Sequence, residues 1–103
     1  MRMWMIAPSR LCRQHLLGEH KELHMLLGSI KKGKSIAGFL KNGLLEPQNI
    51  YSRHEAIVAE MKKRGYNHNS PLTNIKISSN LYGKVNKLKS AHDLKCRCKE
   101  CKL

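Results

Sequence analysis

Residues 12–30 read CRQHLLGEHKELHMLLGSI, and this stretch decides the fold because it carries the strongest periodic pattern in the chain. Pro8 and Ser9 precede it and are typical of a helix start. Its apolar side chains recur at the spacing of one helical stripe, at Cys12, Leu16, Leu23, Leu27 and Ile30. We therefore expect a long helix that begins after Pro8 and Ser9 and buries one face.

Weaker helical patterns follow this stretch. Residues 36–40 are expected to form a short apolar turn or helix between glycines. A second long helical pattern ends at the cations of residues 62–64 and at Gly65, a combination typical of a helix C-terminus. Its apolar stripe is Ile50, Ile57, Val58 and Met61. A third helix reaching towards His92 is indicated by Leu81, Val85 and Leu88. An alternating strand pattern is confined to residues 74–78.

These patterns predict an all-α fold with about three helices and an irregular N-terminal lead. A chain of 103 residues has room for one core. We expect residues 1–95 to form the helical domain and residues 96–103 to form a basic, cysteine-rich tail.

The charge of the chain favours a polyanionic partner. Lys and Arg number 20 against 7 Asp and Glu, which gives a formal net charge of +13. Nucleic acid is the first candidate partner and an acidic membrane surface the second. The apolar run at residues 3–7 is shorter than the about 7–15 residues of a secretory signal or the about 20 of a spanning helix. We therefore expect a cytoplasmic protein with reduced thiols and no membrane partner.

One match to a phosphate-binding motif is excluded by its context. Gly28, Gly33, Lys34 and Ser35 fit the pattern G-x-x-x-x-G-K-[ST]. That loop must follow a strand and open a helix, whereas here it follows a helix. A basic turn that touches a phosphate backbone is the better interpretation.

Three cysteines of the tail and a histidine four residues upstream of them could hold zinc. His92, Cys96, Cys98 and Cys101 would complete a tetrahedral Cys₃His site. However, small zinc modules usually space their ligands as two separated pairs, and here all four lie within a short segment. Exposed thiols in a basic tail remain the alternative.

The first helix carries two of the few acids in the chain. His15, Glu19 and Glu22 share a face that borders the apolar stripe, at about 100° of rotation per residue. A carboxylate there is costly unless it is paired or used in chemistry. Arg53 could neutralise either acid, so a structural and a catalytic role both stay open.

The other histidines of the helical segments give no motif of their own. His54 falls in the apolar stripe of the second helical pattern and is interpreted as a packing residue. His20, His24 and His68 are interpreted as surface or core-edge residues.

The order of several short segments resembles the pyrimidine-dimer DNA glycosylase family, also called phage-type endonuclease V. The resemblance covers roughly residues 1–71 and rests on Met1-Arg2-Met3-Trp4, Gln14-His15-Leu16, Glu19, Glu22-Leu23, Arg53 and Lys63-Arg64-Gly65-Tyr66-Asn67. It implies a compact helical domain with its N-terminal segment threaded between helices. It also implies excision of a damaged base followed by β-elimination at the abasic site. The implied nucleophile is the α-amine of Met1, and the implied catalytic carboxylate is Glu22.

Further site residues follow from the same resemblance. Arg2 and His15 match family residues near the reacting sugar, and Lys21 stands where the phage enzyme has Arg. The phosphate-binding candidates are Lys31, Lys32, Lys34, Lys63 and Arg64. For each of them, a charge on a solvated face or at a helix end is an equal alternative.

Three departures from the phage enzyme concern its amine and its grip on DNA. There Thr supplies the amine after the initiator Met is removed, whereas here Met1 holds that position and the large Arg2 disfavours its removal. Met25 replaces an Arg, and the segment LKCRCKECKL has no counterpart of the aromatic C-terminal residues that help recognise the dimer. The resemblance therefore implies the chemistry and leaves the lesion open.

We accordingly expect a monomeric DNA repair enzyme that acts on damaged double-stranded DNA without a cofactor, zinc in the tail being the one exception considered. The alternative is a non-catalytic basic DNA- or RNA-binding module on the same scaffold. The enzyme and the binding module would use the same basic residues, so the net charge favours neither interpretation.

Overall fold

The strongest sequence pattern forms the longest helix, α1 (Arg13–Lys31), in a computed structural model that describes residues 1–68 and 70–103. The helix begins after Pro8 and Ser9 as expected, but these two residues do not cap it. Residues Pro8–Arg10 form a separate 3-10 helix, and Cys12 is the N-cap of α1. The two helices are distinct because Leu11, 2% exposed, turns into the core in an extended conformation and interrupts the helical hydrogen bonds.

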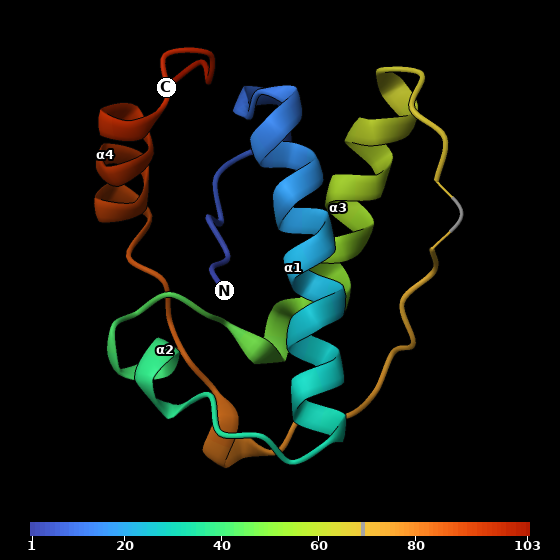
Figure 1. Ribbon diagram of the computed structural model, residues 1–103, viewed down its shortest axis with the longest axis vertical. Helices are drawn as coiled ribbons and strands as arrows, with labels where there is room; N and C mark the ends of the chain where they lie inside the picture. The colour runs from blue at the N-terminus through green and yellow to red at the C-terminus, as the bar shows by residue number, and fades with distance from the viewer. Residues whose placement is uncertain (69) are drawn as a thin grey trace.

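Helix α3 (Ile50–Lys63) packs against α1 and contains the second apolar stripe. Leu16 and Leu23 of α1 and Ile57 of α3 are fully buried. The helix ends as its sequence predicts, because Gly65 takes up the left-handed conformation, with φ 82°. In the chain, the two long helices are separated by the short α2 (Ala37–Lys41) and the 3-10 helix Pro47–Asn49. The two long helices form the centre of the molecule (Figure 1).

The third predicted helix exists but lies further along the chain, as α4 (Lys87–Arg97). Leu81 belongs to a separate 3-10 helix, Ser79–Leu81, and Leu88 is 85% exposed. The predicted stripe was therefore wrong. The buried face of α4 consists of Ser90 and Leu94, and Asn86 caps the helix by accepting a hydrogen bond from the backbone N–H of Lys89.

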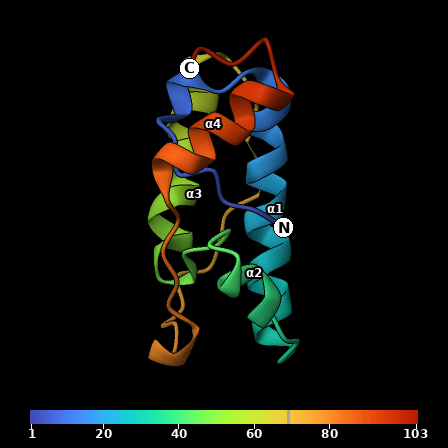
Figure 2. The same ribbon diagram turned by 90° about the vertical axis from the view of Figure 1, so that its left-hand side faces the viewer.

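The N-terminal lead runs between α4 on one side and α1 and α3 on the other (Figures 1 and 2). Met3, Trp4 and Ile6 are buried in the core. The backbone of the lead is fixed by Leu44, whose carbonyl accepts from Met3 N at 2.8 Å, and by Ser90, whose hydroxyl donates to Trp4 O at 2.7 Å. The all-helical, single-globule prediction is confirmed over the described residues, and residues 74–78 form no strand.

The C-terminal segment packs against the start of the chain. Lys102 N donates to Arg10 O at 2.8 Å, and Arg10 Nε donates to Lys102 O at 2.9 Å. Cys101 is buried, and the predicted tail, residues 96–103, begins inside α4. The C-terminal segment therefore packs against the residues that precede α1.

No helix of the described chain combines the length and the hydropathy that a membrane crossing requires.

Candidate active site

The two carboxylates of α1 occupy different environments. Glu19 is 1% exposed and is paired with Arg53, whose Nε and Nη2 donate to its two oxygens. The same carboxylate accepts from the backbone N–H of Trp4 at 3.1 Å. Glu19 is therefore fully used in holding the N-terminal lead, which bears out the pairing with Arg53 that the sequence left open.

Among the described residues, Glu22 has no such ion pair, and it lines a cavity of about 510 Å³. Met1, Arg2 and His15 line the same cavity. Burial raises the pKa of Glu22, whereas the positive charge of the N-terminus and a backbone hydrogen bond with Arg2 lower it in part. A carboxylate with a raised pKa beside an α-amine is suited to general acid-base chemistry.

Arg2 is held at the cavity by α4. Its Nη2 lies 2.8 Å from Oδ2 of Asp93, and its guanidinium carbon lies 4.2 Å from the ring centroid of Trp4. The hydrogen bond from Arg2 lowers the pKa of Asp93. Helix α4 therefore takes part in positioning a residue at the N-terminus.

The chain matches the family described as pyrimidine dimer DNA glycosylase over residues 1–74. It belongs to this family. No curated protein and no solved structure matches the chain significantly. Membership of the pyrimidine dimer DNA glycosylase family implies a DNA repair enzyme that acts on damaged DNA.

The family match ends before α4, yet the cavity includes one residue of that helix. Arg97 lines the cavity and brings a cation to it. Phe39 of α2 and Leu44 supply part of the apolar wall. Sequence reasoning missed these residues because nothing in their local pattern indicates that they face Glu22.

Of the predicted basic residues, Arg2 lines this cavity, whereas the predicted lysines and Arg64 do not. Lys21 is exposed on α1, and within the described chain it does not line the cavity. Lys31, Lys32, Lys34 and Lys63 are likewise exposed and outside it. Arg64 is engaged in the fold, since it pairs with Glu60 at 2.7 Å and donates to the carbonyl of Leu11 at 2.6 Å.

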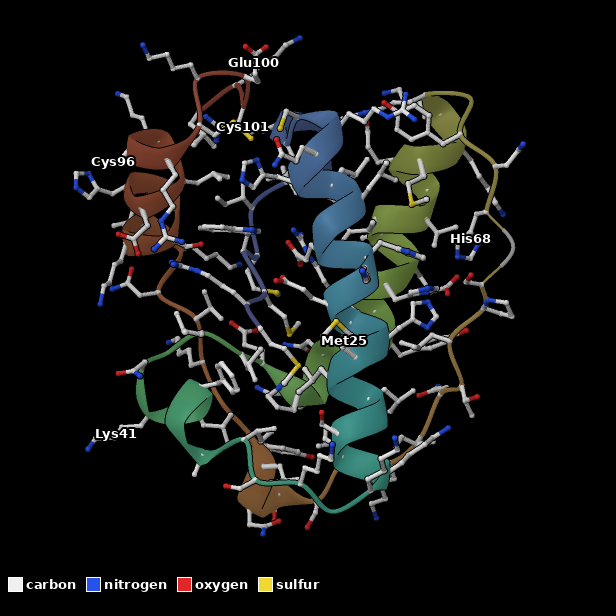
Figure 3. The ribbon with its side chains drawn as sticks, viewed as in Figure 1. Met25, Lys41, His68, Cys96, Glu100 and Cys101 are labelled. Carbon is white, nitrogen blue, oxygen red and sulfur yellow. The ribbon has the colours of Figure 1, made fainter. Side chains whose placement is uncertain are left out.

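A second cavity of about 470 Å³ adjoins the first and shares Arg2 and Leu44 with it. Its wall includes three cations that sequence reasoning did not single out, namely Lys41, Lys84 and Lys89. Lys41 points away from the body of α2 in Figure 3. The surface next to Glu22 is therefore basic, although not through the predicted lysines.

Two groups of side chains could bind metal ions, and the first shares His15 with the cavity of Met1 and Glu22. The first, the cysteine cluster, consists of Cys12, His15, Cys98 and Cys101. The predicted partners His92 and Cys96 are not part of it; they form a separate pair, 3.8 Å apart, on the exposed side of α4. Figure 3 shows Cys101 beside the start of α1 and Cys96 on the other side of α4.

The second group, the histidine cluster, consists of His20, His24, His54 and His68. Burial lowers the pKa of His20 to about 4, with smaller contributions from the other three rings, and burial also lowers the pKa of His24. His20 and His24 are therefore neutral near pH 7. The interpretation of His54 as a packing residue and of the others as separate surface residues missed that the four rings meet.

Proposed function

We propose that this protein is a DNA glycosylase with abasic-site lyase activity, in which the α-amine of Met1 is the nucleophile. The observation that carries the proposal is that Met1 and Glu22 line one cavity while the lead behind Met1 is held by α1, α4 and Leu44. An anchored lead keeps the terminal nitrogen near the carboxylate without a long flexible arm.

The α-amine suits this chemistry near neutral pH. Its reference pKa is about 7.7–8.0, against about 10.4 for Lys, so a useful fraction is unprotonated. The amine nitrogen bonds to C1′ of the deoxyribose, the glycosidic bond breaks, and the base leaves with the electron pair. The nitrogen then loses a proton and the sugar ring opens, which gives an imine with C1′.

Glu22 supports both halves of the reaction. Its carboxylate stabilises the cationic iminium at C1′ and assists removal of a proton from C2′. The electrons of that C–H bond form the new double bond, and the C3′–O bond breaks so that the 3′ phosphate leaves. Hydrolysis of the imine then frees the amine.

Duplex DNA is the substrate class that the charge favours. Arg2 and His15 are site neighbours of the reacting sugar, and Arg97 adds a cation at the same cavity. We assign the nearest phosphate contacts to Lys41, Lys84 and Lys89. Lys21, Lys31, Lys32, Lys34 and Lys63 remain candidates for outer phosphate contacts, whereas the bonds of Arg64 give it a structural role.

Access to C1′ requires the damaged nucleotide to leave the base stack, so the DNA is bent or locally opened in the complex. A pyrimidine dimer or related base damage is the proposed lesion. The enzyme acts as a monomer in the compartment that holds the DNA.

Borohydride trapping on DNA with an abasic site tests the proposal. An imine intermediate is reduced to a stable amine, so untagged protein should give a covalent DNA adduct. Glu22→Gln should lower its yield about 100-fold, while Glu100→Gln, which alters an exposed carboxylate after α4, should leave it unchanged. Binding to the DNA without any adduct would instead favour the non-catalytic module.

A further inference from the structure

Four ligand atoms of the cysteine cluster converge on one point between the two ends of the chain. The sulfurs of Cys12 and Cys98 lie 3.8 Å apart, and Nδ1 of His15 lies 3.1 Å from Cys12 Sγ and 3.7 Å from Cys101 Sγ. All four atoms lie within 4.8 Å of one another. Such convergence of three thiols and one imidazole is the donor set of structural zinc sites.

The separations are close to those of tetrahedral coordination, and the pair formed by Cys12 Sγ and His15 Nδ1 is the one that is shorter. With Zn–S bonds of about 2.3 Å and Zn–N bonds of about 2.0–2.1 Å, two sulfurs stand about 3.8 Å apart and a sulfur and a nitrogen about 3.5 Å apart. Cys98 and Cys101 form a C-x-x-C turn. The backbone N–H of Cys12 donates to Cys101 Sγ at 3.2 Å, a contact that stabilises a thiolate.

The geometry points to a structural Zn²⁺ site formed by Cys12, His15, Cys98 and Cys101. It joins the N-cap of α1 to the segment after α4, and so holds α4 across the N-terminal lead. Through α4 it keeps Asp93 against Arg2 and Arg97 at the cavity. His92 and Cys96, which share the same tail, lie outside the ligand set.

A different observation carries a second site at the histidine cluster. His20 and His24 lie one turn apart on α1, His54 lies on α3, and His68 lies on the connection that follows it. One ring nitrogen from each lies within 4.8 Å of the other three. Within the described chain, all four Nε2 atoms are buried without a hydrogen-bond partner.

Unpartnered nitrogens of this kind are unfavourable unless something binds them. His54 is 0% exposed, and its Nδ1 lies 3.1 Å from the carboxylate of Glu55. His24 is hydrogen-bonded to the backbone of Ser70. A second ring nitrogen that donates to a carboxylate or a carbonyl is the usual support for a metal-bound imidazole, because it directs the other lone pair at the metal.

We infer that the histidine cluster binds a second divalent transition metal, for which Zn²⁺ is the probe. Four imidazoles are borderline ligands that suit zinc. This site joins α1, α3 and the following connection, and it is separate from the cysteine cluster in both ligands and elements.

The zinc content of the protein reports on both sites independently of any activity on DNA. We would express the full chain in zinc-supplemented medium and measure zinc per chain by elemental analysis and native mass spectrometry. The expected value is two. Cys98→Ser with Cys101→Ser should remove one equivalent, and His20→Gln with His24→Gln should remove the other. The matched controls Cys96→Ser and His92→Gln should retain both.

Each site has its own contradicting result. Retention of both zinc equivalents by the double serine variant, or a disulfide between Cys12 and Cys98 in the purified chain, would overturn the cysteine site. One equivalent in the wild type that the double serine variant loses completely would overturn the histidine site. Loss of zinc from the Cys96→Ser control would show that the ligands are misassigned.

Cobalt substitution keeps the test decisive if a variant does not fold. In the wild-type chain, Co²⁺ at the cysteine cluster should produce thiolate-to-cobalt charge-transfer absorption in the near ultraviolet. A second equivalent of Co²⁺ should add ligand-field absorption in the visible without further charge-transfer intensity. Absence of the charge-transfer band contradicts the first site, and saturation at one equivalent contradicts the second.

Discussion

Arg53 and Glu19 form a buried ion pair that holds the N-terminal lead against the helices. Arg53 Nη2 and Nε donate to Oε1 and Oε2 of Glu19, and Nη1 donates to the carbonyl of Ile6 at 2.7 Å. Glu19 in turn accepts from the backbone of Trp4. The pair therefore connects α1, α3 and the lead, and leaves Glu22 as the carboxylate that can serve catalysis.

The two acids of α1 should respond differently to the same substitution. Glu19→Gln leaves Arg53 buried without its counter-charge, so we expect the free energy of unfolding to fall by about 3–5 kcal/mol. Glu22→Gln should change it by no more than about 0.5 kcal/mol. Urea denaturation of both variants measures the contrast. Equal destabilisation by the two substitutions would contradict the division of roles.

The lyase rate should depend on pH through Glu22. Because burial raises the pKa of this carboxyl, it stays protonated, and inactive as a base, to a higher pH than an ordinary Glu at about 4.3. The single-turnover rate of β-elimination should therefore rise with pH through that raised pKa. The Glu22→Gln variant should lack this limb, and an identical acid limb in the variant would refute the assignment.

Asp93→Asn should impair catalysis more than stability. The Arg2–Asp93 pair is only partly buried, so its loss should cost no more than about 1 kcal/mol in unfolding. Arg2 would lose its fixed position at the cavity, and we expect the single-turnover rate to fall about 10-fold. Glu100→Gln, an exposed acid of the tail, is the control. A wild-type rate in Asp93→Asn would contradict the claim that α4 positions Arg2 at the cavity.

Ser90→Ala tests how α4 anchors the lead. Its hydroxyl, 1% exposed, donates to the carbonyl of Trp4, which the substitution would leave without that donor. We expect a loss of about 1–3 kcal/mol in unfolding free energy, measured by denaturation. Ser79→Ala changes an exposed serine and should be close to neutral. A neutral Ser90→Ala would mean that α4 does not hold the lead.

Local patterns predicted the long helices because these follow from contacts a few residues apart. The apolar stripe of α1 and the cationic, glycine-terminated end of α3 are examples. The stripe at Leu81, Val85 and Leu88 failed because α4 buries Ser90 and Leu94 in place of leucines at that spacing. A helix that buries one hydroxyl and one leucine has too weak a periodicity to be recognised.

The candidate site was predictable only in part, for the same physical reason. The face of α1 grouped His15, Glu19 and Glu22, and Arg53 was available as a partner. The choice between Glu19 and Glu22 depends on packing between α1 and α3, and Arg97 reaches the cavity from far along the chain. Likewise, Cys12 meets Cys98 and His20 meets His68 only through tertiary contacts.

The central claim is that the α-amine of Met1 forms the bond to the sugar. Borohydride-trapped DNA adduct, digested and mapped by peptide mass spectrometry, tests it most directly. We predict that the modified atom is the N-terminal nitrogen of Met1, and that one residue added before Met1 abolishes trapping while thermal unfolding stays unchanged. An adduct on a lysine side chain, or undiminished trapping by the extended chain, would contradict the account.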